Sequence, residues 1–456
     1  MSNKNSFSSS AEVFSWLSQF INLERGQSVK SFRIDRMEAL AEIAGRPERC
    51  APSIHIAGSK GKGSVTGMLA AMLTADGRRA ARYMSPHVVD IRERICLGDK
   101  YFDEDIYCTA GGELREIAEV KLPAAKNPLF NPANEEGAEP TFFELLTLYF
   151  FLCARHAKCD VMVVETGMGG RLDSTNILDP LVSVITLIEL EHTSFLGNTI
   201  AAVAGEKAGI IKQGKPLILA KQSDEAFDIF KEKAQEKNSP LIYLPDAAEI
   251  SNVKISPQGT SFNLSFATEQ ALFSKPLSLS IPVPGKVQAD NAALAVAAVK
   301  TAFPQIGEDA IRRGLETLNI PARFEKISET PPFIIDGAHT PQSLSLCIET
   351  FCSLYGEGGV LIFGCAADKD AAAMAKIALP HFAKIIITTP GTFKISNPEL
   401  VYEAFVKEGK EKVQLEKDTQ EAIKQTLELS RKKKSSRTGN WFFLFSIGDQ
   451  EICKRE

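Results

Sequence analysis

In the first two thirds of the chain, segments with the apolar pattern of buried strands alternate with segments whose apolar residues recur at helical spacing. Short, continuous apolar runs are typical of strands that are buried on both faces of a parallel sheet. Such runs occur at residues 54–57, 160–165, 181–187 and 215–220, and residues 78–83 are predicted to form a further short strand. Apolar residues at helical spacing lie between them, as at residues 65–77 and 141–153. This alternation predicts a doubly wound parallel sheet of the α/β class.

The later part of the chain adds two further patterns. Apolar and polar residues alternate across residues 253–281, which predicts antiparallel hairpins attached to the first domain. From residue 333, strands and helices alternate again, which predicts a smaller, Rossmann-like α/β domain. Its predicted strands are 333–335, 360–363, 385–388 and 441–445, and its predicted helices include 343–354 and 371–378.

The boundary between the domains is placed where prolines interrupt the helical pattern. Helices are predicted at 291–300 and 309–318. We therefore predict an N-terminal domain at residues 1–302 and a C-terminal domain at residues 303–456. The hinge is predicted at about 303–322.

The secondary structure of the remaining segments is predicted from the positions of glycine, proline and charged residues. Residues 11–45 are predicted to be helical with a break at Gly26. Three polar or proline-rich stretches are predicted to be loops, at residues 90–94, 121–140 and 431–434.

Composition and charge exclude several classes of protein. The 456 residues are 44% hydrophobic and carry a net charge of -5, which argues against a nucleic-acid binder. No apolar run has the length of about 18–20 residues that a membrane span needs. The nine cysteines form no CxxC pair, and the N-terminal residues lack the apolar core of a signal peptide. We expect a cytoplasmic, monomeric protein that binds small molecules.

A glycine-rich turn follows the first apolar run and precedes a helix. It contains Gly58, Gly61, Lys62, Gly63 and Ser64. Backbone N–H groups and the positive end of a helix dipole meet at such a turn, which favours bound phosphate. The spacing is not that of the Walker motif, and the alternative is a flexible turn without a ligand. The context of strand and helix favours a P-loop-type ATPase domain.

Polar side chains follow the other predicted strands. Glu165 comes directly after a buried strand, where a carboxylate is well placed to bind Mg²⁺. His192 follows the next strand, and its position fits a metal ligand and a hydrogen-bonded loop histidine equally well. In the second domain, Asp336 and His339 also follow a strand, and Arg323 lies just after the hinge. Two domains with such residues facing a hinge suggest a site that closes on a nucleotide.

Ten motifs occur in order between residues 57 and 370. They are AGSKGKGS, YMSPHVVDIRERI, TFFELLTL, VVETGMGGRLDSTN, EHTSFLGNT, EKAGIIK, NAALAVAA, PARFE, DGAHTPQS and FGCAADKD. The series resembles the folylpolyglutamate synthase/dihydrofolate synthase family of the Mur ligase superfamily, and covers most of the chain.

The resemblance implies roles for individual residues. The phosphate loop is matched by Gly61, Lys62, Gly63 and Ser64, and the ligands of Mg²⁺ by Ser85, Glu165 and His192. The residues that hold ATP are matched by Asn291, Arg323 and Asp336, with His339 beside them. Lys207, to which composition gives no role, matches a lysine that is carbamylated in the family. The pterin site is matched by Thr141, Phe142, Phe143, Glu144, Leu172, Asp173 and Ser174.

The chain departs from the family pattern at a few positions. Ser59 and Lys60 stand where the family usually has Thr and Asn. Glu191 stands where it prefers Asp, and Thr340 where it prefers Asn. The surroundings of Arg92 and Arg94 are also richer in charge. None of these departures removes a predicted catalytic group, although they affect the predicted geometry of the phosphate loop and the substrate preference.

The resemblance implies an ATP-dependent amide ligase with Mg²⁺ as cofactor. It would add L-glutamate to dihydropteroate, to the γ-glutamyl tail of a reduced folate, or to both, through an acyl phosphate. Lys62, Lys207 and His192 are the predicted catalytic residues. Two alternatives are a Mur-type ligase that acts on a cell-wall precursor and a nucleotide-dependent switch without ligase activity.

Overall fold

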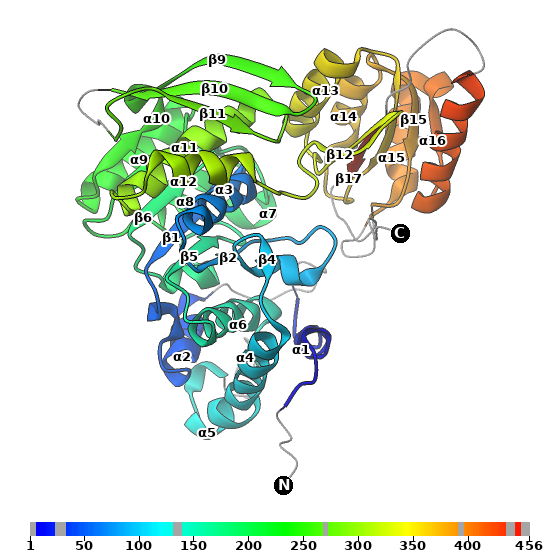
Figure 1. Ribbon diagram of the computed structural model, residues 1–456. Coiled ribbons are helices and arrows are strands. Elements are labelled where there is room, and N and C mark those ends of the chain that lie inside the picture. Colours follow the sequence, from blue (N-terminus) through cyan, green and yellow to red (C-terminus); the bar gives the residue numbers. More distant parts are fainter. Residues whose placement is uncertain are drawn as a thin grey trace.

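The computed structural model describes residues 6–22, 33–130, 139–267, 272–390, 396–434 and 443–447. Figure 1 shows two α/β domains, a larger one coloured blue to green and a smaller one coloured yellow to red. The predicted fold class is confirmed. Among the described residues, no helix is both long and apolar enough to span a bilayer.

The central sheet of the larger domain has eight strands in the order β4-β3-β2-β5-β1-β6-β7-β8. Strands β2, β5, β1, β6, β7 and β8 run parallel, and β3 and β4 are an antiparallel edge. The bounds are β1 Ser53–Ala57, β2 Ala80–Tyr83, β3 Ile95–Leu97, β4 Lys100–Tyr101, β5 Val161–Glu165, β6 Val182–Ile185, β7 Leu217–Leu219 and β8 Leu241–Tyr243. β1 pairs with both β5 and β6, so the loops after these three strands leave the same edge.

Helices cover both faces of this sheet. On β5, Val163 packs in the core that contains α3 and α11, and Val164 packs in the core that contains α4 and α6. The continuous apolar character of β5 therefore reflects burial on both faces. The helix bounds are α1 Ser10–Leu17, α2 Ile34–Ile43, α3 Lys62–Ala75, α4 Glu104–Glu116, α5 Leu122–Ala125, α6 Phe142–His156, α7 Thr193–Leu196, α8 Ile200–Ala208, α9 Asp224–Glu236, α10 Leu244–Ala247, α11 Lys286–Ala302 and α12 Glu308–Glu316.

An antiparallel sheet of three strands is added to the larger domain, as predicted. It contains β9 Ala248–Ser256, β10 Gly259–Phe266 and β11 Leu277–Ile281. The helix α12 lies inside the predicted hinge and packs closely on α3, since a Cβ at Gly314 would lie 2.5 Å from Met72 Cα. The domain boundary at residues 302 and 303 stays a prediction.

The smaller domain has a six-stranded sheet in the order β12-β13-β17-β14-β15-β16. All pairs are parallel except β12 with β13. The strand bounds are β12 Glu325–Glu329, β13 Pro332–Asp336, β14 Gly359–Gly364, β15 Phe382–Ile387, β16 Val413–Leu415 and β17 Phe443–Ile447. The helix bounds are α13 Pro341–Tyr355, α14 Ala371–Ala378, α15 Pro398–Gly409 and α16 Thr419–Lys434.

Three predicted loops are wrong. Residues 90–94 contain a 3₁₀ helix, η3 Ile91–Arg94, that a capping box starts. Residues 121–130 include the end of the π-helix η4 Ile117–Lys121, then α5, which contains Pro123, and a short 3₁₀ helix. Residues 431–434 continue α16, because lysine and arginine are good helix formers. Gly26, Trp441 and residues 131–138 lie outside the described residues.

Candidate active site

Neighbouring elements hold the glycine-rich loop between β1 and α3 tightly. Gly61 caps α3 with φ of +88°, and a Cβ there would lie 2.6 Å from Asn291 Oδ1. Gly58 has φ of +150°, and a Cβ there would lie 1.7 Å from Thr186 Oγ1. Side chains are excluded at both points, so glycine is required. The loop therefore lies between the end of β6 and α11.

Lys62 turns back over this loop. Its Nζ donates a hydrogen bond of 2.7 Å to the carbonyl oxygen of Gly58. Ser64 lies buried in the first turn of α3. The N-terminal amides of α3 and a lysine ammonium thus stand at one place, which is an arrangement suited to a phosphate.

Glu165 ends β5 beside this loop. Its side chain is buried, and its Oε2 has no hydrogen-bond partner among the described residues. Burial raises the pKa of Glu165 to about 7, although Lys62 and Arg323 oppose this rise. A buried carboxylate oxygen without a partner is costly unless a cation binds to it. The carboxylate therefore fits a divalent metal ion that prefers oxygen ligands.

The two other predicted metal ligands are placed differently. Ser85 is half-buried after β2, and its backbone N–H donates to the Glu165 carboxylate. His192 is exposed at the start of α7, with φ of +46°. Among the described residues, no three His, Cys, Asp or Glu side chains are grouped so that they could hold a metal. The structure thus brings Ser85 to Glu165, and the role of His192 stays a prediction.

Lys207 lies beneath the phosphate loop. Only 1% of its side chain is exposed, and its Nζ lies 2.7 Å from Glu191 Oε1 and 2.8 Å from the Gly58 carbonyl oxygen. Burial, with Lys62 nearby, lowers the pKa of Lys207 to about 8. Burial alone would raise the pKa of Glu191, but Lys62 and Lys207 together lower it to about 2. The Gly58 carbonyl thus accepts hydrogen bonds from two lysines.

The smaller domain contributes Arg323 to the same place. A Cβ at Gly63 would lie 3.7 Å from Glu165 Oε2 and 3.9 Å from Arg323 Nη2. Arg323 Nη1 donates to the carbonyl oxygen of Ala322 at 3.1 Å. A cation from after the hinge therefore stands beside the phosphate loop and the buried carboxylate of the larger domain.

Asp336 and His339 organise the backbone around Arg323. Asp336 is half-buried at the end of β13 and accepts hydrogen bonds of 2.8 Å from the backbone N–H groups of Phe324 and Ala338. Burial raises the pKa of Asp336, and Arg323 opposes this rise. His339 Nδ1 lies 2.8 Å from the carbonyl oxygen of Gly337.

The residues predicted for the pterin site divide into buried and half-buried groups. Thr141 and Glu144 form a capping box at the start of α6, and Glu144 also pairs with Arg36 at 3.1 Å. The buried residues are Phe142, Glu144 and Asp173. The half-buried residues are Thr141, Phe143, Leu172 and Ser174. Only the second group has surface that a substrate could contact directly in this conformation.

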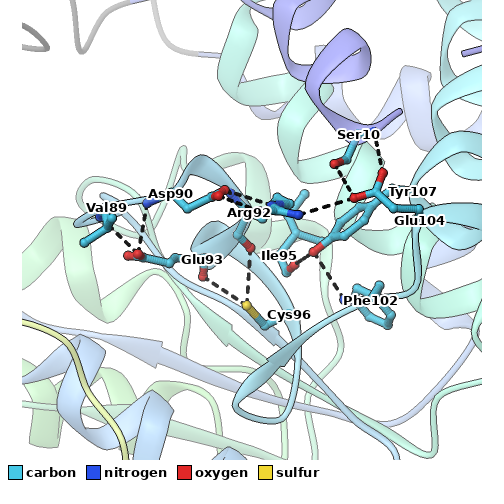
Figure 2. Close-up of polar contacts among 10 residues, drawn as sticks. All are labelled: Ser10, Val89, Asp90, Arg92, Glu93, Ile95, Cys96, Phe102, Glu104 and Tyr107. Atoms are coloured by element: carbon cyan, nitrogen blue, oxygen red, sulfur yellow. Dashed lines mark hydrogen bonds and ion pairs between the residues drawn. The ribbon is translucent and has the colours of Figure 1, made fainter. Parts of the chain in front are cut away.

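The segment after Ser85 is held by a carboxylate, as Figure 2 shows. Glu93 accepts hydrogen bonds from the backbone N–H groups of Val88 at 2.6 Å, Val89 at 3.0 Å and Asp90 at 3.0 Å. Arg92 links this segment to α4 through Glu104 at 3.3 Å. Tyr107 Oη donates to the carbonyl oxygen of Ile95 at 2.5 Å. These bonds fix the backbone between β2 and β3.

Comparisons with known proteins identify the family. Residues 119–299 match the Mur ligase middle domain, and residues 322–435 match the Mur ligase glutamate ligase domain. The dihydrofolate synthase/folylpolyglutamate synthase of Bacillus subtilis is 32% identical over 349 residues, which are 75% of this chain and 77% of that protein. This chain belongs to the folylpolyglutamate synthase/dihydrofolate synthase family of Mur ligases.

Other members of the folylpolyglutamate synthase family are similar over most of their length. The Lacticaseibacillus casei enzyme is 32% identical over 81% of this chain and 84% of that protein. The Mycobacterium tuberculosis enzyme complexed with ADP and AMPPCP has a TM-score of 0.83 at 27% identity, over 96% of this chain and 95% of that chain. A complex of the synthase with AMPPCP and folate has a TM-score of 0.75 at 27% identity, over 92% of this chain and 99% of that chain.

In this member of the folylpolyglutamate synthase family, the contacts of two site residues are not predicted from the sequence. The sequence marks Glu191 only as a departure from the family pattern, yet its carboxylate pairs with Lys207. It predicts a loop at Glu93, yet the Glu93 carboxylate holds the segment after Ser85. The only feature of the sequence that could indicate the role of Glu93 is the ER pair in the motif YMSPHVVDIRERI. For Glu191, the corresponding feature is its negative charge directly before His192.

Proposed function

We propose that this chain joins the amine of L-glutamate to a folate carboxylate, with ATP as the source of energy. The acceptor is dihydropteroate, the γ-glutamyl tail of a reduced folate, or both. The observation that carries this proposal is the meeting of Lys62, Glu165 and Arg323 around Gly63. Two cations and a buried carboxylate, whose Oε2 has no hydrogen-bond partner among the described residues, surround a glycine-rich loop there.

The reaction has two steps. A carboxylate oxygen of the acceptor attacks the γ-phosphorus of ATP, the bond to the bridging oxygen breaks, and ADP leaves. The glutamate amine then attacks the acyl carbon, inorganic phosphate leaves, and the amine loses a proton. Phosphoryl transfer depends chiefly on positioning and on neutralising charge on the phosphoryl oxygens. Lys62 and Arg323 would neutralise that charge, and the N-terminal amides of α3 would orient the phosphates.

Mg²⁺ fits the buried end of β5. Glu165, with Ser85 and His192, would hold it. The orphaned Glu165 Oε2 is the structural reason for this assignment. When bound, the ion would supply positive charge beside the transferred phosphoryl group. The nucleotide site would be completed by Gly58, Gly61, Ser64, Asn291, Asp336 and His339.

Lys207 is proposed to carry a carbamate. Burial lowers the pKa of Lys207 to about 8, so a larger share of its amine is neutral at pH 7 than for an exposed lysine. The neutral amine would attack the carbon of CO₂ and lose a proton, which leaves one negative charge near the metal site. The half-buried Phe143, Leu172 and Ser174 are proposed to contact the pterin. We also propose that the protein acts in the cytoplasm as a monomer.

Product analysis with purified protein tests the proposed function. The protein is incubated with ATP, Mg²⁺ and glutamate, and ADP is measured with dihydropteroate, with tetrahydrofolate and with a UDP-linked muramoyl peptide. ADP formation that requires both glutamate and one of the two pterin substrates supports the proposal. ADP formation only with the muramoyl peptide, or nucleotide binding without ADP formation in any mixture, would overturn it.

A further inference from the structure

A buried histidine lies on β1, three residues before the phosphate loop. The neighbours of His55 on this strand, Ile54 and Ile56, both pack in the core that contains α3. Successive side chains of a strand point to opposite faces, so His55 points to the other face of the sheet. It is fully buried there, and its Nε2 lies 2.8 Å from Thr175 Oγ1.

The hydrogen bonds continue from Thr175 to a carboxylate. Thr175 Oγ1 donates to Asp173 Oδ1 at 2.5 Å, and the Thr175 N–H donates to the same oxygen at 3.0 Å. The second oxygen of Asp173 accepts from the N–H of Met168 at 2.9 Å. The Asp173 side chain thus spans the loop formed by residues 167–173, which follows Glu165.

The direction of these bonds assigns the proton on His55. The hydroxyl proton of Thr175 is used toward Asp173, so Thr175 Oγ1 accepts from His55 Nε2–H. His55 Nδ1 then carries no proton, and it has no hydrogen-bond partner among the described residues. Burial, with Lys212 nearby, lowers the pKa of His55 to about 3, which keeps the ring neutral.

The loop at 167–173 lies directly against two predicted site residues. A Cβ at Gly167 would lie 2.3 Å from Phe143 Cζ, and a Cβ at Gly170 would lie 3.0 Å from Lys207 Cα. The N–H of Arg171 donates to the carbonyl oxygen of Glu206 at 2.7 Å. The loop therefore fills the space between the start of α6 and α8, and any shift of it would move its contact with Phe143.

The geometry points to His55 as a positioning residue for the folate acceptor, which acts through Thr175 and Asp173 on the loop at 167–173. This inference rests on the proposed function, in which Phe143, Leu172 and Ser174 contact the pterin. Removal of the Nε2–H donor leaves the Thr175 hydroxyl free to rotate away from Asp173. The loop then loses its link to β1, while the backbone of the phosphate loop keeps its own contacts with Thr186 and Asn291.

Two pairs of variants test this relay. His55→Gln keeps a donor near the position of Nε2, and His55→Met removes it at similar volume. Thr175→Ser keeps the hydroxyl, and Thr175→Val removes it. We expect His55→Met and Thr175→Val each to raise the KM for the folate acceptor about tenfold, with the KM for ATP changed less than twofold. His55→Gln and Thr175→Ser should stay within about threefold of the unchanged protein. Because both substitutions break one chain of bonds, the double variant should resemble either single variant.

Hydrogen exchange gives a readout that does not depend on activity. Amides at residues 168–173 should exchange faster in His55→Met than in His55→Gln. Ile54→Val, which loses a buried methyl group on the same strand, should lower the melting temperature without changing either KM. Equal behaviour of His55→Met and His55→Gln, or a parallel rise of both KM values, would overturn the inference. If the unchanged protein ligates no folate, the acceptor role is wrong, and exchange alone decides whether the relay holds the loop.

Discussion

The ammonium group of Lys207 lies 2.7 Å from a carboxylate oxygen of Glu191, and both groups lie beneath the phosphate loop. The exposed fractions of the two side chains are 1% and 13%. Attraction between two charges is strong in such surroundings, but so is the cost of removing either charge alone. This pair therefore ties α8 to the loop before α7, and its integrity decides how Lys207 is presented to the site.

Substitution of Glu191 by Gln should destabilise the protein strongly. In protein whose Lys207 carries no carbamate, the ammonium would stay buried without a counter-charge, and such a loss typically costs about 3–5 kcal/mol of unfolding free energy. Urea denaturation measures the change. Asp179→Asn is a matched control, because it breaks the exposed pair with Lys215 and should cost less than about 1 kcal/mol. A Glu191→Gln protein as stable as this control would contradict a structural role for the pair.

The stability of the metal-free protein should depend on the ionisation of Glu165. Its pKa in the folded protein is about 7, above the ordinary value of 4.5, so the folded state binds the proton more tightly. The stabilisation from this group is complete below pH 4.5 and is lost as the pH rises to about 7. At 1.36 kcal/mol per pH unit, the loss is about 3 kcal/mol.

Denaturation of the unchanged protein and of Glu165→Gln at several pH values tests this. The variant should gain stability relative to the unchanged protein between pH 4.5 and about 7. Added Mg²⁺ should stabilise only the unchanged protein at pH 8, because the ion binds the ionised carboxylate of the folded state. A difference between the two proteins that does not change with pH would show that Glu165 titrates normally.

Lys62→Ala should lower turnover by about 10²-fold or more, with a much smaller effect on stability. Preorganised contacts to developing charge typically contribute a factor of about 10²–10³. Steady-state ADP formation at saturating ATP measures turnover. Lys60→Ala, two residues earlier, separates loss of this contact from a general loss of positive charge and should retain more activity. An unchanged rate in Lys62→Ala would remove this residue from the proposed mechanism.

Arg323→Ala should raise the KM for ATP about tenfold, because the variant removes the cation that the smaller domain places beside Gly63. Lys replaces the charge but not the planar group, so Arg323→Lys should recover only part of the loss. Arg313, which reaches the Ala75 carbonyl from the exposed side of α12, provides a control as Arg313→Ala. Equal KM values for ATP in Arg323→Ala and Arg313→Ala would contradict the assignment.

Glu93→Gln should loosen the segment that carries Ser85. The amide retains one acceptor oxygen, whereas the carboxylate accepts from three backbone N–H groups. Hydrogen bonds to charged groups typically contribute about 1.5–3 kcal/mol each, so we expect a loss of about 2 kcal/mol in unfolding free energy. Thermal melting checks this, with Glu232→Gln on the exposed face of α9 as the control. A melting temperature equal to that of the control would show that the hydrogen bonds to the Glu93 carboxylate do not stabilise the protein.

The fold could be predicted because its signals are local. The apolar run of β5 and the glycines after β1 can each be recognised from a few neighbouring residues. The order of strands and helices along the chain then limits the possible sheet topologies. Arg323 and Glu165 could also be placed near one edge, since both follow predicted strands or a predicted hinge. The roles of these residues in catalysis remain predictions.

The contacts missed from the sequence join distant segments or depend on backbone details. Lys207 and Glu191 are 16 positions apart, and no periodicity indicates that both turn beneath Gly58. The charged segment around Glu93 predicts a loop, yet the Glu93 carboxylate accepts hydrogen bonds from three backbone amides. The π-helix η4 before α5 was hidden by the proline-rich stretch that follows it.

β1 sits between β5 and β6 with the register Ile56 opposite both Glu165 and Val184. Rows of interstrand hydrogen bonds resist sliding, so the turns that leave these three strands keep their mutual spacing during turnover. Insertions that lengthen the remote β9–β10 hairpin would leave this spacing alone, whereas one residue added inside β1 would reverse the faces of His55 and Ile56. β1 therefore sets the spacing of the turns that follow β1, β5 and β6. Insertions and deletions should be tolerated least in this strand.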